Sequence, residues 1–248
     1  MGLMHYFWGL EVWEKDGEIF LGQGKYVTDI LKRSRIQYFW PVMMPMITNW
    51  KKINASGDKE VDPTLYRQLI GSLMYLVNTR PYFWFIVNTL SQFMVELKRV
   101  HWAATRPILR SVRGTVRYGL KYTWGDDIRL CGFRDADWED ISVDKKSTSR
   151  YCFNVGLGMV SWCIRKQKSV ALSSAKAEYM ATSTTMCEAI WISKLLVSLF
   201  KQRMGATNVY CDNQSFIKLS ENLVFNDRSK RIDTRCHFIR DYVQRGAV

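Results

Sequence analysis

The chain has 248 residues, of which 47% are hydrophobic, so it is long enough to bury one large core or two modest ones. Its 36 Lys and Arg residues outnumber its 23 Asp and Glu residues, and the resulting net charge of +13 favours a polyanionic partner such as nucleic acid. No uncharged apolar run of about 18 residues occurs, so we expect no membrane insertion.

The six cysteines lie at positions 131, 152, 163, 187, 211 and 236. They form no CxxC pair and no histidine stands at zinc-finger spacing, so a structural zinc site is not expected. Each lies in an apolar-rich segment, and the first residues lack the pattern of a signal peptide. These features predict reduced thiols in an intracellular protein, cytoplasmic or nuclear, that is not secreted.

The first part of the chain predicts a hairpin followed by helices. Asp16-Gly17 stands between two aromatic-rich apolar runs, residues 3–13 and 18–22, which is typical of a β-hairpin. Residues 23–36 predict a short helix with positive charge near its end. Residues 37–63, which contain three prolines, predict a long surface connection.

Three further helices follow in the prediction. Residues 64–80 carry an apolar stripe at helical spacing, and Pro81 separates them from a second helix over 83–97, which suggests an antiparallel pair. A third helix is predicted over 101–117. Because an interior proline costs roughly 3 kcal/mol, we expect this helix to begin near Arg106 or to kink at Pro107.

One face of the third helix carries a row of arginines, Arg106, Arg110, Arg113 and Arg117. Two interpretations stay open for this row. The arginines either bind a phosphate backbone along the helix or form the solvated face of an exposed helix.

Gly125-Asp126-Asp127 marks a polar break near the middle of the chain. Paired aspartates occur at polymerase sites, but Gly and Asp before a strand are ordinary turn residues. We interpret the break as a turn and as a boundary between two domains, residues 1–125 and 126–248.

The second domain has the sequence pattern of an α/β fold. Residues 128–137, 148–156 and 158–166 predict three antiparallel strands, with a turn around Gly156. The remaining predicted elements are a long helix over 173–200, a strand over 207–212 and two helices over 213–222 and 233–245.

The long helix is amphipathic. Its predicted packed face consists of Glu178, Ala181, Thr185, Ala189, Ile192, Leu196 and Leu199. An ionised glutamate is almost never buried without a partner, so Glu178 is expected to meet a cation, either an arginine or a metal ion. The alternative is that Glu178 lies at the frayed edge of the stripe.

Two predicted strands end in an aspartate, Asp135 in the first and Asp212 in the fourth. The helical crossover between them would place these strands side by side and parallel, with Glu178 facing the same spot. We expect the three carboxylates to converge, with no cationic neighbour in sequence, as suits Mg²⁺ or Mn²⁺. Three acids that serve only as caps are the alternative.

Several motifs closely resemble the ribonuclease H domain of Ty1/copia-type retrotransposon Pol polyproteins. They are DADW from Asp135, KKSTSRYCF, VSWCIRKQKSVALSSAKAEYMA, CDNQS and KRIDTRCHFIRD. HYFWGLEV, YRQLIGSLMYLVNTRP, HWAATRPILRSVRGT and YGLKY resemble the segment of the same polyprotein that follows the polymerase palm. The resemblance covers nearly the whole chain.

The resemblance implies a ribonuclease H-like mixed sheet of order 3-2-1-4-5 that cleaves the RNA strand of an RNA/DNA hybrid with two Mg²⁺ (or Mn²⁺). The implied metal-binding and catalytic acids are Asp135, Glu178 and Asp212. The expected partners are the hybrid or another nucleic acid and other parts of Pol. The candidate nucleic-acid contacts are Gln214, Ser173, Ser174, Arg106, Arg110, Arg113, Lys166 and Lys168.

Departures from the family pattern predict weak or absent activity. No Tyr-x-Asp-Asp motif occurs, so no DNA synthesis is expected. The family's last strand and final helix, with a fourth acid, would follow Val248, and Lys176 stands where the family has a capping glutamate. Two functions stay open, a metal-dependent ribonuclease and a silent nucleic-acid-binding fragment of a decayed element. No sequence feature favours a host-recruited interaction module.

Overall fold

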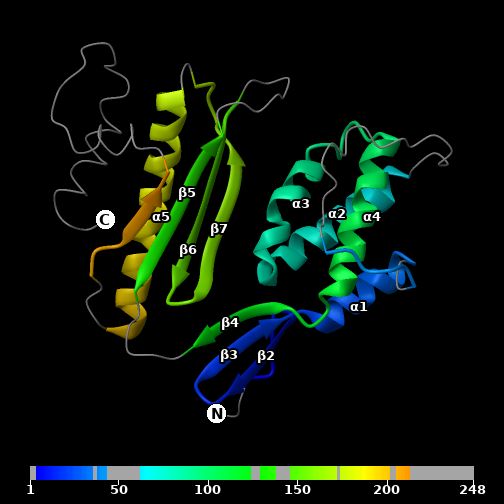
Figure 1. The fold of residues 1–248 in the computed structure, drawn as a ribbon, viewed down its shortest axis with the longest axis horizontal. Coiled ribbons are helices and arrows are strands. Elements are labelled where there is room, and N and C mark those ends of the chain that lie inside the picture. The colour runs from blue at the N-terminus through cyan, green and yellow to red at the C-terminus, as the bar shows by residue number, and fades with distance from the viewer. Residues whose placement is uncertain are drawn as a thin grey trace. The chain divides into compact units, whose positions relative to one another are not determined.

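The computed structural model describes residues 4–35, 38–43, 62–123, 129–137, 146–171, 174–201 and 205–212 (Figure 1). The chain divides into two compact units, Met1–Trp124 and Gly125–Val248. The described part of the first unit combines four α-helices with a four-stranded sheet, and that of the second combines the helix α5 with a four-stranded sheet, in agreement with the predicted α/β class. The predicted turn at 125–127 and the predicted helices over 213–222 and 233–245 lie outside the described residues.

The sheet of the first unit has the order β1-β2-β3-β4, and all its neighbours are antiparallel. Asp16 and Gly17 have φ of 48° and 79°, the left-handed conformation that a tight hairpin turn requires, so the predicted hairpin is confirmed. The sequence did not predict β4, which pairs with β3. The strands are β1 Tyr6–Phe7, β2 Leu10–Lys15, β3 Glu18–Gly22 and β4 Gly119–Thr123.

The helices of the first unit are α1 Gly24–Arg33, α2 Pro63–Leu76, α3 Trp84–Ser91 and α4 Arg99–Gly114. Asp62 caps α2, because its Oδ1 accepts the backbone N–H of Thr64 at 2.7 Å. Short 3₁₀ turns, Val77–Thr79 and Pro81–Phe83, separate α2 from α3. Because α3 ends at Ser91, the predicted helix over 83–97 is too long at its C-terminal end.

Pro107 lies inside α4, which runs from Arg99 to Gly114, so the expectation that the helix begins near Arg106 is wrong. A proline lacks the N–H that would bond the carbonyl four residues earlier. The buried face of α4 compensates for this loss. Ile108, Leu109 and Val112 are each at most 2% exposed, so the packing of the turn after the proline outweighs its local cost.

Arg80 is fully buried and connects the segment after α2 to the segment after α4. Its Nη1 donates to Thr115 Oγ1 at 2.6 Å, and its Nη2 donates to the carbonyls of Val116 and Tyr118 at 3.0 and 3.2 Å. Burial lowers the pKa of Arg80. These bonds hold the chain at the start of β4, where it enters the sheet.

The sheet of the second unit has the order β7-β6-β5-β8, in which β8 is parallel to β5 and the other neighbours are antiparallel. Helix α5 packs against β5 and β6 on one face of this sheet (Figure 1). The core between them consists of Leu130, Phe153, Ala189, Ile192 and Leu196. The elements are β5 Leu130–Asp137, β6 Thr148–Val155, β7 Gly158–Lys166, α5 Ser174–Phe200 and β8 Asn208–Cys211.

The predicted packed face of α5 is correct except at its end. Glu178, Ala181, Thr185, Ala189, Ile192 and Leu196 are all buried, whereas Leu199 is 66% exposed. The core that α5 shares with the sheet reaches Leu196, one turn earlier. The last turn of the helix therefore adds no buried residue at position 199.

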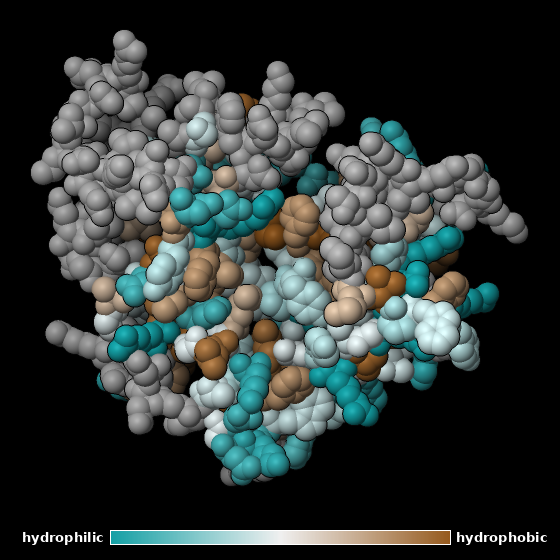
Figure 2. Space-filling view, viewed as in Figure 1, coloured by the Kyte–Doolittle hydropathy of each residue, from teal (hydrophilic) through white to brown (hydrophobic). Residues whose placement is uncertain are grey.

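Hydrophilic and hydrophobic residues are interspersed over the face shown in Figure 2. Within the described residues, none of the helices combines the length and the apolar character needed to cross a bilayer. The cysteines of this part of the chain, Cys131, Cys152, Cys163, Cys187 and Cys211, form no disulfide.

Candidate carboxylate site

Asp135 and Asp212 lie on neighbouring parallel strands. In the ladder between β5 and β8, Phe133 is opposite Tyr210 and Arg134 is opposite Cys211. An aspartate follows each member of the pair Arg134 and Cys211. Asp135 lies within β5, and Asp212 comes directly after β8. The crossover thus brings the two aspartates to adjacent positions near the C-terminal ends of β5 and β8.

The side chains of Arg134 and Asp135 point to opposite faces of the sheet. Successive side chains of a strand alternate in direction, and Arg134 reaches Glu178 on α5. Asp135 therefore shares the other face with Phe133, whose ring stacks on Tyr210 at a centroid distance of 5.2 Å. Glu178 and Asp135 project onto different sides of β5.

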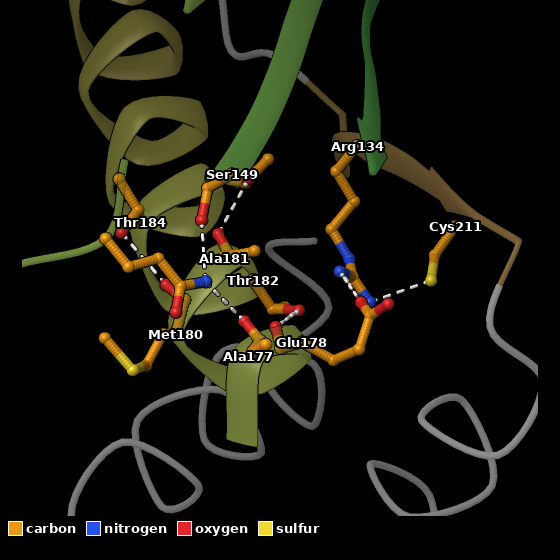
Figure 3. A network of polar contacts seen from close by, with 11 residues as sticks. Arg134, Ser149, Ala177, Glu178, Met180, Ala181, Thr182, Thr184 and Cys211 are labelled. Atoms are coloured by element: carbon orange, nitrogen blue, oxygen red, sulfur yellow. Dashed lines mark hydrogen bonds and ion pairs between the residues drawn. The ribbon is translucent and has the colours of Figure 1, made fainter. Parts of the chain in front are cut away.

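Glu178 forms a buried ion pair with Arg134, between Oε2 and Nη1 (Figure 3). The side chains of Arg134 and Glu178 are only 1% and 9% exposed. The other terminal nitrogen of the guanidinium, Nη2, donates to Cys211 Sγ at 2.8 Å. Arg134 therefore connects α5 to β8, and the expected cation beside Glu178 is an arginine of the chain itself.

The first turns of α5 are fixed to the sheet by Gln167, which is 6% exposed. Its Nε2 donates to Ser149 Oγ of β6 at 2.9 Å and to the carbonyl of Ala177 at 2.8 Å. Figure 3 shows Ala177 beside Glu178, whose own carbonyl accepts a bond from Thr182 Oγ1 at 2.8 Å. The start of α5, which carries Glu178, is therefore held against β6 through Gln167.

Asp135 also has a cationic partner. Its Oδ2 accepts a bond from Arg150 Nη1 of β6 at 3.1 Å. Both side chains are partly exposed, 49% for Asp135 and 31% for Arg150. The statement that the acids have no cationic neighbour in sequence is wrong, because Arg134 directly precedes Asp135. Two of the three carboxylates form ion pairs with arginines.

A hard divalent cation such as Mg²⁺ needs several oxygen ligands directed at one point. Within the described residues, which include Asp135, Glu178 and Asp212, no three His, Cys, Asp or Glu side chains are grouped so that they could hold a metal ion. One oxygen of Glu178 is bound by Arg134 and one oxygen of Asp135 by Arg150. As arranged here, these residues do not fit a metal ion.

Comparison with known proteins identifies the origin of the chain. It is 39% identical over 245 residues to the retrovirus-related Pol polyprotein from transposon RE2 of Arabidopsis thaliana, with 99% of this chain and 17% of that protein covered. The chain belongs to the Pol polyproteins of copia-type retrotransposons. The Pol polyprotein from transposon RE1 of the same plant has the same identity and coverage.

A third relative, the Pol polyprotein from transposon TNT 1-94 of Nicotiana tabacum, is 36% identical over 235 residues, which are 91% of this chain and 17% of that protein. The chain thus spans about a sixth of the length of these Pol relatives. No model of a known protein family matches it.

The candidate nucleic-acid contacts fall in both units of this Pol-family chain. In the first unit, Arg106 and Arg110 line a groove of about 890 Å³ between α1, α2 and α4, together with Arg33 and Arg35. Arg110 also donates from Nε to the carbonyl of Trp40 at 2.7 Å, and Arg113 is not among the lining residues. Lys166, Lys168 and Ser174 belong to the second unit, and Ser173 and Gln214 lie outside the described residues.

The sequence reasoning missed Arg134 and Arg150 at the site. A signal for Arg134 was present, because it directly precedes Asp135 in the chain. Arg150 lies opposite Asp135 in the ladder between β5 and β6 and could be found only once the register of the hairpin was known.

Proposed function

We propose that the second unit is a ribonuclease H-type domain of a copia-type Pol polyprotein, descended from an enzyme that cleaves the RNA strand of RNA/DNA hybrids. In this chain it binds nucleic acid and hydrolyses the hybrid weakly or not at all. Asp135, Glu178 and Asp212 are the candidate catalytic residues of the ancestral enzyme. The proposal extends to this chain a chemistry that the family resemblance implies.

The observation that carries the proposal is the strand order. The third, second, first and fourth strands of the unit lie side by side, with α5 in the connection that returns the chain parallel to β5. This order is the 3-2-1-4 part of the sheet implied by the resemblance. It puts Asp135 and Asp212 on adjacent strands, at the edge where open α/β sheets bind ligands.

A second candidate function, a nucleic-acid-binding domain without hydrolysis, is favoured by the Arg134–Glu178 pair. A carboxylate bound by a buried guanidinium is not available to a metal ion or to substrate. The net charge of +13 and the arginine-lined groove support affinity for a phosphate backbone in either case. The two candidates therefore differ in cleavage and not in binding.

The test is a cleavage and binding assay on a fluorescent RNA/DNA hybrid with Mg²⁺ or Mn²⁺. Wild type and Asp135→Asn are compared, with a DNA duplex of the same sequence as substrate control. We expect salt-sensitive binding by both proteins. We expect cleavage that is absent or at least about 10²-fold below that of an active ribonuclease H assayed alongside.

Two results decide the matter. Rapid cleavage of the hybrid by wild type, abolished by Asp135→Asn, would show a working ribonuclease and remove the claim of weak activity. Absence of any binding to hybrid or duplex at low salt would refute the proposed function as a whole.

A further inference from the structure

We propose that Arg134 is a resident cation that takes the place of a divalent metal ion beside Glu178, so that this chain holds neither Mg²⁺ nor Mn²⁺ there. The inference rests on the proposed function, because it concerns the carboxylates of the ancestral ribonuclease H site. It goes further by naming the residue that closes the site.

Glu178 needs a positive charge beside it. A buried carboxylate requires a cation or a protonated state, and the side chain of Glu178 is 9% exposed. A metal ion would satisfy it in a hydrolytic site. Here Arg134, itself 1% exposed, supplies that charge from the neighbouring strand β5.

The guanidinium of Arg134 is held in a fixed position. Its two terminal nitrogens are both engaged, Nη1 with Glu178 and Nη2 with Cys211 Sγ at 2.8 Å. A metal ion that bound Glu178 would have to expel Arg134 and leave a buried guanidinium without its carboxylate. The dry surroundings of Arg134 therefore favour the ion pair over the metal.

The carboxylate of Asp135 has a different environment. Asp135 points to the opposite face and forms its own pair with Arg150, but that pair is partly exposed and therefore weak. Arg150→Ser frees a single exposed carboxylate, whereas Arg134→Ser frees the buried Glu178. Each substitution removes one arginine, so Arg150→Ser is the matched control for Arg134→Ser.

The test measures Mn²⁺ binding by electron paramagnetic resonance, and thermal melting in EDTA, MgCl₂ or MnCl₂, on the whole chain. The proteins are wild type, Arg134→Ser, Arg134→Ser/Glu178→Gln, Glu178→Gln and Arg150→Ser. We expect Mg²⁺ and Mn²⁺ to shift the Tm of wild type and Arg150→Ser by less than about 1 °C. Arg134→Ser should melt at a lower temperature than wild type, because it leaves Glu178 buried without a cation, and Arg134→Ser/Glu178→Gln should recover part of this loss. Neither variant should bind Mn²⁺ tightly, because Glu178 alone does not supply the several oxygen ligands that a divalent ion needs.

Wild type that binds Mn²⁺, with binding lost in Glu178→Gln, would overturn the inference. This comparison decides the question even where Arg134→Ser does not fold. An Arg134→Ser variant as stable as wild type would also overturn it, because the guanidinium would then not be the cation that the buried Glu178 requires. Neither readout depends on hydrolysis or on nucleic acid, so a failure here is distinct from the loss of hybrid binding that would refute the proposed function.

Discussion

Arg134 and Glu178 form an ion pair buried between β5 and α5, 44 residues apart in the chain. Breaking such a pair from one side leaves a buried charge without a partner and costs about 3–5 kcal/mol of unfolding free energy. Replacing both members by apolar residues of similar volume is often neutral or stabilising. The pair therefore fixes the position of α5 on the sheet more than it adds net stability.

We predict that Arg134→Met and Glu178→Met each lower the unfolding free energy by about 3–5 kcal/mol, and that the double substitution recovers most of this loss. Urea denaturation measures all three. Arg150→Met is the control, because it breaks the partly exposed pair with Asp135 and should cost less than about 1 kcal/mol. Additive losses in the double variant would show that the two side chains are not coupled.

Stability should fall below pH 6.5 because of His101 in the first turn of α4. Its Nδ1 accepts the backbone N–H of Lys98 at 3.1 Å, and its ring stacks on Phe93. Burial, with a smaller contribution from Lys98, lowers the pKa of His101 from its usual 6.5. The unfolded chain therefore binds the proton more readily, and the stability present above pH 6.5 is lost as the pH falls toward the lowered folded pKa.

Glutamine at position 101 keeps a side-chain acceptor for the Lys98 N–H but does not titrate. We predict that His101→Gln flattens the fall of Tm between pH 7 and pH 5 relative to wild type. Thermal melts across this range check it. An equal fall of Tm in both proteins would assign the pH dependence to other groups.

Gly119 of β4 lies opposite Gly22 of β3, at a point where the strands leave no room for a side chain. A Cβ at position 119 would meet the backbone carbonyl oxygen of Leu21, which cannot move without breaking the ladder. We predict that Gly119→Ala lowers the unfolding free energy by about 1–3 kcal/mol.

Gly71, on an exposed part of α2, is the matched control. A Cβ there meets no atom within 4 Å, so Gly71→Ala should stabilise the chain by about 0.5–1 kcal/mol through helix propensity. Both effects are measured by denaturant titration. A Gly119→Ala variant as stable as wild type would contradict the close approach of β3 and β4.

The arginine-lined groove should contribute phosphate contacts. We predict that Arg35→Gln/Arg106→Gln weakens binding of hybrid and duplex alike, and that the slope of log affinity against log salt falls by about one per arginine that contacts a phosphate. Lys15→Gln/Arg117→Gln removes the same charge outside the groove and should change the slope less. Equal effects of the two pairs would indicate binding by overall charge.

Local signals predicted much of the fold. Asp16-Gly17 specified its hairpin because the turn and both strands are contiguous, and the spacing of Glu178 to Leu196 specified the buried face of α5. The pairing of β4 with β3 was not predictable, since Gly119 and Gly22 are distant in sequence. At Pro107, tertiary packing overrode a local rule.

The candidate site was predictable in part for the same reason. Placing an aspartate at the end of each of two strands needs only the strand pattern and the crossover rule, and the structure has Asp135 and Asp212 on adjacent strands. The partners of the carboxylates depend on which face each residue takes. That choice depends on the register of three elements, so the pairing of Arg134 with Glu178 could not be read from the spacing of the acids.

The replacement of a metal ion by Arg134 is tested most directly with a crystal of the whole chain soaked in MnCl₂, in which anomalous diffraction locates the metal. We expect Arg134 to stay paired with Glu178 and no manganese peak to lie within coordination distance of the Glu178 carboxylate. A manganese ion bound by Glu178 together with Asp135 or Asp212, with Arg134 turned away, would contradict this expectation.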